Sequence, residues 1–103
     1  MSEVIHKIRN IPVSRTVESS FVYATSELGE LADEVLSGLN MSIKPNSEDG
    51  ILGECVDVMV CMLDIIQLSY PQFSSTELSM LIDRKLLEKV NKWSNKDYSK
   101  KQV

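Results

Sequence analysis

Residues 51–68 read ILGECVDVMVCMLDIIQL, and this stretch is the most apolar part of the chain. Apolar residues fall on nearly every face of a helix built from it, so such a helix must be covered all round. Glu54, Asp57 and Asp64 interrupt the stretch. A charge at the centre of a bilayer costs about 2.5–3.5 kcal/mol, so a membrane span is not expected. Two further helices can hardly cover this segment, and we expect the core to continue across a subunit interface.

A long helix is predicted before this stretch, from about Thr16 to Ser37. Apolar residues recur there in alternating steps of four and three, the spacing of one helical stripe: Val17, Phe21, Ala24, Leu28, Leu31 and Val35. Gly38 stands where a left-handed cap residue would end the helix. Residues 1–13 suit a short N-terminal helix that Pro12 interrupts.

The apolar stretch itself belongs to a predicted helix over about residues 48–69, which Ser47 can cap and Pro71 ends. Residues 38–47 read as a loop. A third long helix should begin after Ser74, which has capping-box spacing to Glu77. A flexible tail is expected over about residues 95–103. The prediction is one all-α domain over residues 1–103, a bundle of three main helices completed by oligomerisation.

Composition narrows the classes of function. The 103 residues fit one domain, and 15 acidic against 11 basic residues give a net charge of −4. This balance disfavours binding to a nucleic acid polymer through a basic surface. Cys55 and Cys61 lie six residues apart, about 9 Å on a helix, which is too far for a disulfide. We therefore expect reduced thiols and a cytoplasmic protein without a secretory signal.

Two carboxylate pairs carry the clearest chemical signal. Glu27 and Glu30 are three residues apart on the first long helix, and Glu54 and Asp57 are three apart on the second. Spacing by three places each pair on one helix face. On antiparallel neighbours the four acids would share one small volume, where like charges oppose ionisation unless a cation such as Mg²⁺ binds between them. The alternative is that both pairs lie on solvated faces, and Asp64 is expected to be structural or an interface residue.

Other catalytic chemistries find no matching residues. His6 is the only histidine, whereas a di-iron carboxylate bundle needs Glu-x-x-His motifs on two helices. The same histidine is the only base available to a Ser-His-Asp triad. No glycine-rich phosphate loop occurs in the sequence.

The two pairs resemble the signature of the MazG-type all-α nucleoside triphosphate pyrophosphohydrolases, which is E-x-x-E followed by E-x-x-D. Here the motifs lie in SELGELADEV (residues 26–35) and LGECVDVMVCML (residues 52–63), with 23 residues between Glu30 and Glu54. The likeness covers about residues 16–93. Many family members have an additional Glu where this chain has Ser26, and the chain is less similar to the phosphoribosyl-ATP pyrophosphatases. The resemblance implies Mg²⁺ or Mn²⁺ held by Glu27, Glu30, Glu54 and Asp57.

The third helix carries basic and amide residues at which this family holds phosphate. By resemblance the substrate-binding residues here are Lys85, Lys89, Asn91 and Lys92. The three lysines also form a stripe by their spacing alone, which would complement a metal-bound triphosphate or simply face solvent. Trp93 could stack on a base or fill a core or interface.

These features lead to one expected function and one alternative. The expected activity is Mg²⁺-dependent hydrolysis of a nucleoside triphosphate, more specifically a dNTP, to the monophosphate and pyrophosphate, as in removal of unwanted nucleotides. The four carboxylates would hold the metal, and one of them would activate water. The resemblance also implies a homodimer or homotetramer. The alternative is a non-catalytic oligomeric helical module whose acids are only solvated.

Overall fold

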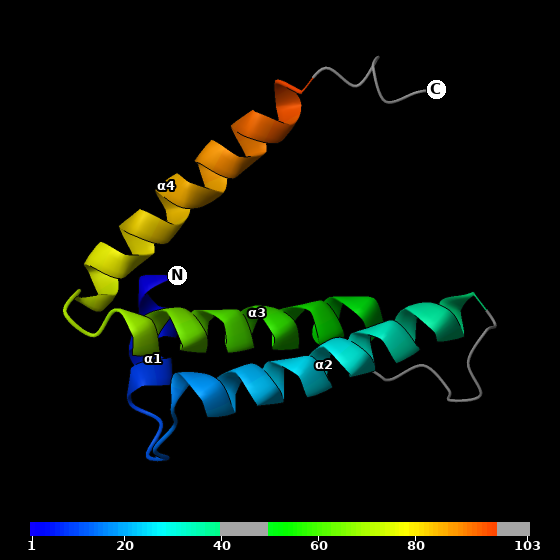
Figure 1. Cartoon of the computed structure of the whole chain (residues 1–103), viewed down its shortest axis with the longest axis horizontal. Coiled ribbons are helices and arrows are strands. Elements are labelled where there is room, and N and C mark those ends of the chain that lie inside the picture. The colour runs from blue at the N-terminus through cyan, green and yellow to red at the C-terminus, as the bar shows by residue number, and fades with distance from the viewer. Residues whose placement is uncertain (40–49, 97–103) are drawn as a thin grey trace.

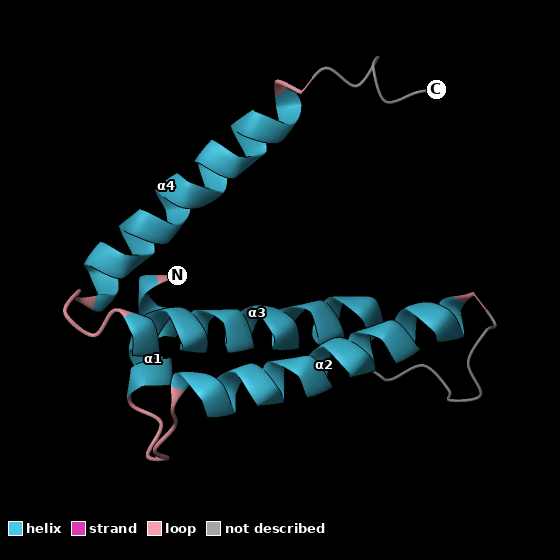
Figure 2. Cartoon of the chain, in the orientation of Figure 1, coloured by secondary structure: helices cyan, strands magenta, loops and turns pink. Residues whose placement is uncertain are grey.

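The chain is all-helical in the parts that the structure, a computed structural model, describes: residues 1–39 and 50–96. These residues contain no strand (Figure 2). The helices in chain order are α1 (Ser2–Arg9), α2 (Val17–Gly38), α3 (Gly50–Ser69) and α4 (Ser75–Ser94) (Figure 1). The all-α prediction is confirmed, including the short N-terminal helix. Residues 40–47 of the predicted loop with the Ser47 cap, the first two residues of the predicted middle helix and most of the predicted tail lie outside the described residues.

Two of the helices begin with a reciprocal pair of side-chain caps. Ser74 accepts a hydrogen bond from the Glu77 backbone N–H (3.0 Å), and the Glu77 carboxylate accepts one from the Ser74 backbone N–H (2.9 Å). This is the predicted capping box of α4. Thr16 and Ser19 make the same exchange at the start of α2, at 3.1 and 3.0 Å. In each box, two backbone N–H groups that lack a partner within the helix are satisfied.

The end of α2 differs from the prediction. Gly38 is the last residue of the helix and has no positive φ, so it is not a left-handed cap. The next residue, Leu39, stays in a right-handed conformation (φ −96°). Its N–H bonds to the carbonyls of Leu36 (3.1 Å) and Val35 (3.3 Å), so these carbonyls are satisfied without a left-handed residue. Among the described glycines only Gly50 has a positive φ, +63°.

Helices α2 and α3 lie side by side as an antiparallel pair, hereafter the hairpin (Figure 1). Helix α1 crosses one end of the hairpin, and α4 packs mainly against α1 and diverges from the hairpin towards its C-terminal end. A compact bundle of three main helices is therefore not confirmed. The buried apolar residues of α1 and α4 are Ile5, Ile8 and Leu78, which are 0%, 5% and 3% exposed.

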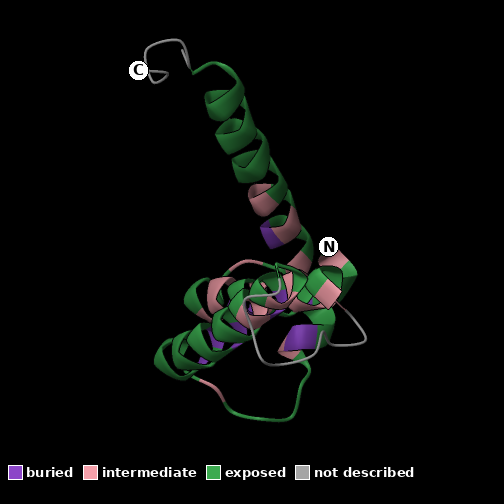
Figure 3. Ribbon diagram, turned by 90° about the vertical axis from the view of Figure 1, so that its right-hand side faces the viewer, coloured by how far each residue is buried: buried purple, intermediate pink, exposed green. Residues whose placement is uncertain are grey.

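The hairpin buries only a minority of its residues (Figure 3), and many of its exposed residues are large and apolar. Its buried residues are small or polar: Ser20, Ala24, Glu27, Glu34, Cys61, Asp64 and Gln67. Of the apolar stripe predicted on α2 only Ala24 is buried, whereas Phe21 is 60% and Leu28 55% exposed. On α3 Leu52 and Met59 are likewise exposed. The stripe exists, but most of it is not buried against α3, and an exposed apolar surface of this kind is typical of an interaction site.

The described residues contain no helix long and apolar enough to cross a membrane. Cys55 and Cys61 are both free, as their spacing predicted.

Candidate metal centre

Three glutamates meet where the middle of α2 faces the beginning of α3. One carboxylate oxygen from each of Glu27, Glu30 and Glu54 lies within 4.8 Å of the others, hereafter the glutamate cluster. Glu27 and Glu30 share a face of α2 because they are three residues apart. The antiparallel course of α3 brings Glu54 to the same level. The first predicted pair thus lies close to Glu54, one member of the second pair.

Two oxygens of the glutamate cluster are buried without a hydrogen-bond partner. They are Oε2 of Glu27 and Oε2 of Glu54. Glu27 is only 8% exposed, so its carboxylate has largely lost contact with water. Among the described residues no Lys or Arg forms an ion pair with the three glutamates. A buried carboxylate without compensation is costly, so these two oxygens would be stabilised by protonation or by a bound cation.

The neighbouring charges disfavour ionisation of Glu54. Its pKa is raised, first because the group is desolvated and then because Glu30, Asp57, Glu27 and Glu34 surround it with negative charge. The Tyr23 hydroxyl donates a hydrogen bond to Glu27, and this bond is the main reason why the pKa of Tyr23 is raised. The electrostatics of the cluster therefore favour either protonation or a bound cation.

A further acid, Glu34, lies one turn beyond Glu30 and is 5% exposed. Its Oε1 atom is 3.9 Å from the point where a Cβ on Gly50 would stand, at the first turn of α3. A Cβ there would make only an ordinary contact with Glu34, so it is the φ of +63° at Gly50 that favours glycine. The burial of Glu34 could not be inferred from helix spacing alone.

The other predicted site residues do not join the cluster. Asp57 is exposed and is not one of the three clustered ligands, although its charge acts on Glu54. The predicted substrate-binding residues lie on the exposed, diverging half of α4, away from the glutamate cluster of their own chain (Figure 1): Lys85, Lys89, Asn91, Lys92 and Trp93. Lys85 instead pairs with Glu88 on the surface at 3.2 Å. His6 is exposed on α1 and contacts Asn10.

No family model matches the chain, and no curated protein or solved structure is significantly similar to it.

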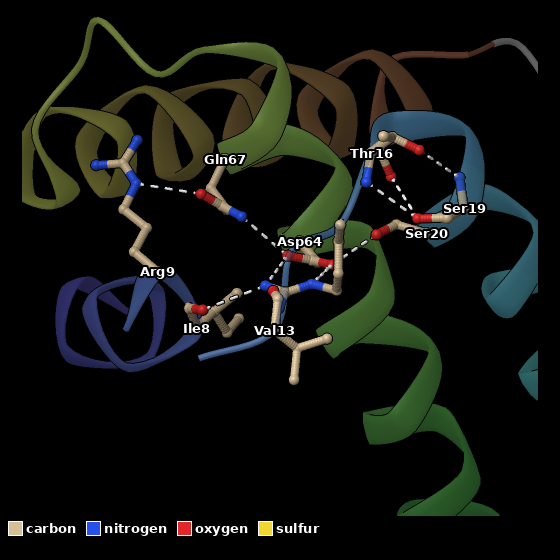
Figure 4. Close-up of polar contacts among 9 residues, drawn as sticks. Ile8, Arg9, Val13, Thr16, Ser19, Ser20, Asp64 and Gln67 are labelled. Carbon is tan, nitrogen blue, oxygen red and sulfur yellow. Dashed lines mark hydrogen bonds and ion pairs between the residues drawn. The ribbon is translucent and has the colours of Figure 1, made fainter. Parts of the chain in front are cut away.

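A second polar group, which the sequence analysis missed as a unit, lies at the α1 end of the hairpin (Figure 4). Asp64 accepts two hydrogen bonds from Arg15, both at 2.7 Å, one from the Ser20 hydroxyl at 2.7 Å and one from Gln67 at 2.9 Å. Arg15 also donates to the carbonyls of Val13 and Ile8. Asp64 is thus structural, as expected, and it ties the α1–α2 connection to α3.

Asp64 and the glutamate cluster differ in how far their carboxylates are paired. Arg15 lowers the pKa of Asp64 to about 2, and Ser20 and Gln67 add to this effect. Asp64 is therefore fully paired, whereas Glu27 and Glu54 each retain an unpartnered oxygen. Carboxylate oxygens are the ligands that a hard divalent cation such as Mg²⁺ prefers. The donor set of the glutamate cluster fits such an ion.

Proposed function

We propose that the chain is a Mg²⁺-dependent nucleoside triphosphate pyrophosphohydrolase, which cleaves a dNTP between its α- and β-phosphates. The unpartnered, buried oxygens of Glu27 and Glu54 carry the proposal, because they make sense if the glutamate cluster holds a divalent cation. The MazG-like motifs then supply the type of reaction. A bound Mg²⁺ would neutralise phosphate oxygens and accept the developing charge; Mn²⁺ has the same preference for oxygen ligands.

The side chains of the cluster have different exposures, which suggests different tasks. Glu27 is buried and held by Tyr23, so it is suited to a fixed ligand. Glu30 is exposed and can orient or deprotonate the attacking water. Asp57 is also exposed, one turn of α3 beyond Glu54, where it can contact the substrate side of the site after a rotamer change.

Self-association is part of the proposal, as a homodimer or homotetramer. The apolar outside of the hairpin and the apolar residues of α4 would both become covered. The same surfaces suit the alternative function, a non-catalytic oligomeric module. The glutamate cluster distinguishes the two, because a module that uses only its apolar surface has no need of buried, unpartnered carboxylates.

A release assay tests the activity. The canonical and damaged dNTPs and NTPs are incubated with the protein and Mg²⁺, and pyrophosphate is detected after conversion to phosphate by an added pyrophosphatase. We expect monophosphate and pyrophosphate from at least one dNTP, and loss of turnover in a chelator. Release of orthophosphate without added pyrophosphatase would show cleavage at another bond. Absence of turnover with every nucleotide would contradict the proposed activity.

Metal binding also has a stability consequence that does not depend on turnover. A cation that binds only the folded chain stabilises it by RT ln(1 + [L]/Kd), about 2.7 kcal/mol at one hundred times Kd. We expect Mg²⁺ to raise the melting temperature of the wild type by several degrees at fixed protein concentration. The Glu27→Gln variant should lose this increase, whereas Glu3→Gln, with the same change of charge on exposed α1, should keep it. An equal increase in all three proteins would exclude the glutamate cluster as the site.

A further inference from the structure

The contact between α2 and α3 contains no fully buried large apolar side chain. Among the described residues of these two helices, those that are fully buried are small, polar or charged, as Ser20, Ala24 and Asp64 are. Helices usually set their relative position by fitting ridges of side chains into grooves. Such fitting is limited here, so directional polar contacts have a larger part in fixing how far α2 is shifted along α3, hereafter the register.

One polar network joins the two helices directly. Ser20 of α2 donates to Asp64 of α3 at 2.7 Å, and Arg15, just before α2, donates to both oxygens of the same carboxylate at 2.7 Å (Figure 4). Gln67 adds a further bond at 2.9 Å, and these four residues are hereafter the Asp64 network. A bidentate contact between arginine and a carboxylate specifies geometry as well as adding energy. The network therefore ties one level of α2 to one level of α3.

The Asp64 network and the glutamate cluster are equally far apart on the two helices. Glu30 lies ten residues after Ser20, and Glu54 lies ten residues before Asp64. Both glutamates are thus about 15 Å along the hairpin from the network. Because α2 and α3 are antiparallel, pairing Ser20 with Asp64 brings Glu30 level with Glu54. A shift of one helical turn, about 5.4 Å, would exceed the 4.8 Å within which the oxygens of the cluster lie.

The glutamate cluster does not hold the helices in this register by itself. Its three carboxylates carry the same charge, and Oε2 of Glu27 and Oε2 of Glu54 have no hydrogen-bond partner. Without a cation, repulsion between ionised carboxylates opposes their approach. The attraction that brings α2 and α3 together at this level must come from other contacts, and the ion pair of Arg15 and Asp64 supplies an interaction of the opposite sign.

We propose that the Asp64 network positions the glutamate cluster: by fixing the register of α2 against α3, it brings Glu54 to the two clustered glutamates of α2. Arg15, Ser20 and Asp64 are then positioning residues, since they would touch neither metal nor substrate. Ligands that are ordered before a cation arrives bind it more tightly, because less freedom is lost on binding. The consequence for metal binding rests on the proposed function, whereas the register does not.

The register is measured as the distance between two spin labels, by pulsed electron paramagnetic resonance without any metal. The labels are attached at Glu18→Cys near the start of α2 and Leu52→Cys near the start of α3, after Cys55→Ala and Cys61→Ala. Both labelled positions are exposed, and they lie towards opposite ends of the hairpin. Excess unlabelled protein restricts the measurement to one chain. We expect one narrow distance, which Asp64→Asn broadens or shifts by up to about 5 Å.

Metal binding is measured with Mn²⁺ alone on the unlabelled variants, with far-UV circular dichroism to verify the helices. Asp64→Asn should weaken Mn²⁺ binding by about tenfold or more, although Asp64 is not a ligand. Ser20→Ala keeps the ion pair; it should broaden the distance and weaken binding about threefold. Ser69→Ala is the same change on α3 outside the network, and Leu78→Ala removes a buried side chain of α4. Both controls should keep the wild-type distance and affinity, even where stability falls.

The proposal requires the distance and the affinity to change together. A network variant that loses stability but keeps both wild-type values would overturn it, as would a change in only one of the two. Should Asp64→Asn fail to fold, Ser20→Ala decides the outcome, because the Arg15 pair remains. A changed distance in the network variants with no binding of Mn²⁺ by the wild type would refute the proposed function and retain the role of the network in the register.

Discussion

Replacing Glu54 by Gln is expected to abolish turnover and, in the absence of divalent cations, to make the protein more stable. Glu54 has a raised pKa because it is desolvated and surrounded by Glu30, Asp57, Glu27 and Glu34. Its ionised form is therefore opposed in the folded state, and a neutral amide of the same shape removes that repulsion. The amide is also a poor ligand for Mg²⁺. A loss of turnover of on the order of 100-fold or more corresponds to about 2.7 kcal/mol of transition-state stabilisation.

The variant should thus lose turnover but gain stability in the absence of divalent cations, and this combination can be measured directly. Melting temperatures of Glu54→Gln and wild type are compared in chelator and in Mg²⁺, with far-UV circular dichroism to verify the helices. We expect the variant to melt higher in chelator and to gain nothing from Mg²⁺. Glu3→Gln should behave as wild type in both conditions and retain turnover. Full pyrophosphate release by Glu54→Gln would refute the site, even if the family resemblance were correct.

The largest loss of stability is expected from Asp64→Asn. The carboxylate is 8% exposed and accepts hydrogen bonds from Arg15, Ser20 and Gln67. Asparagine offers one acceptor oxygen in place of two and leaves the Arg15 charge uncompensated at the junction. We expect a decrease of about 2–4 kcal/mol in the free energy of unfolding by urea. Asp83→Asn, on the exposed half of α4, should change it by less than about 0.5 kcal/mol.

The same interaction predicts a defined dependence on pH. Asp64 has a pKa of about 2 in the folded chain against 3.8 ordinarily, so its ionised form is favoured by folding. The stability that ionised Asp64 gives to the folded chain is therefore fully present above about pH 4, and it is lost as the pH falls towards 2. It amounts to about 2 kcal/mol. The difference in unfolding free energy between wild type and Asp64→Asn should therefore shrink over this range, and a difference that stays constant would exclude the ion pair as its cause.

The sequence predicted the helices well because their signals are local. The capping box of Ser74 and Glu77 and the end of α3 before Pro71 depend only on neighbouring residues, and both are confirmed. The convergence of Glu27, Glu30 and Glu54 also followed from helix spacing once the two helices were assumed to be neighbours. Local spacing and one assumption about pairing were sufficient for these features.

The sequence could not predict how the helices lie relative to one another. The stripe with Phe21 and Leu28 showed that α2 has an apolar face, but not whether that face meets α3 or points outward. The lysines of α4 share a face by spacing, yet the angle of α4 is set by Arg9 and by the packing of α1. The Arg15–Asp64 pair joins residues 49 positions apart, and no pattern in a single sequence links them.

The polar interior of the hairpin has a consequence for how this protein reaches its final form. Ser20, Asp64 and Gln67 occupy positions that usually supply the hydrophobic driving force, so a lone chain gains comparatively little from expelling water. In the proposed homo-oligomer, folding and assembly would therefore be one thermodynamic event, and the fraction of native protein would depend on the protein concentration. Dilution alone would act on this molecule as a mild denaturant.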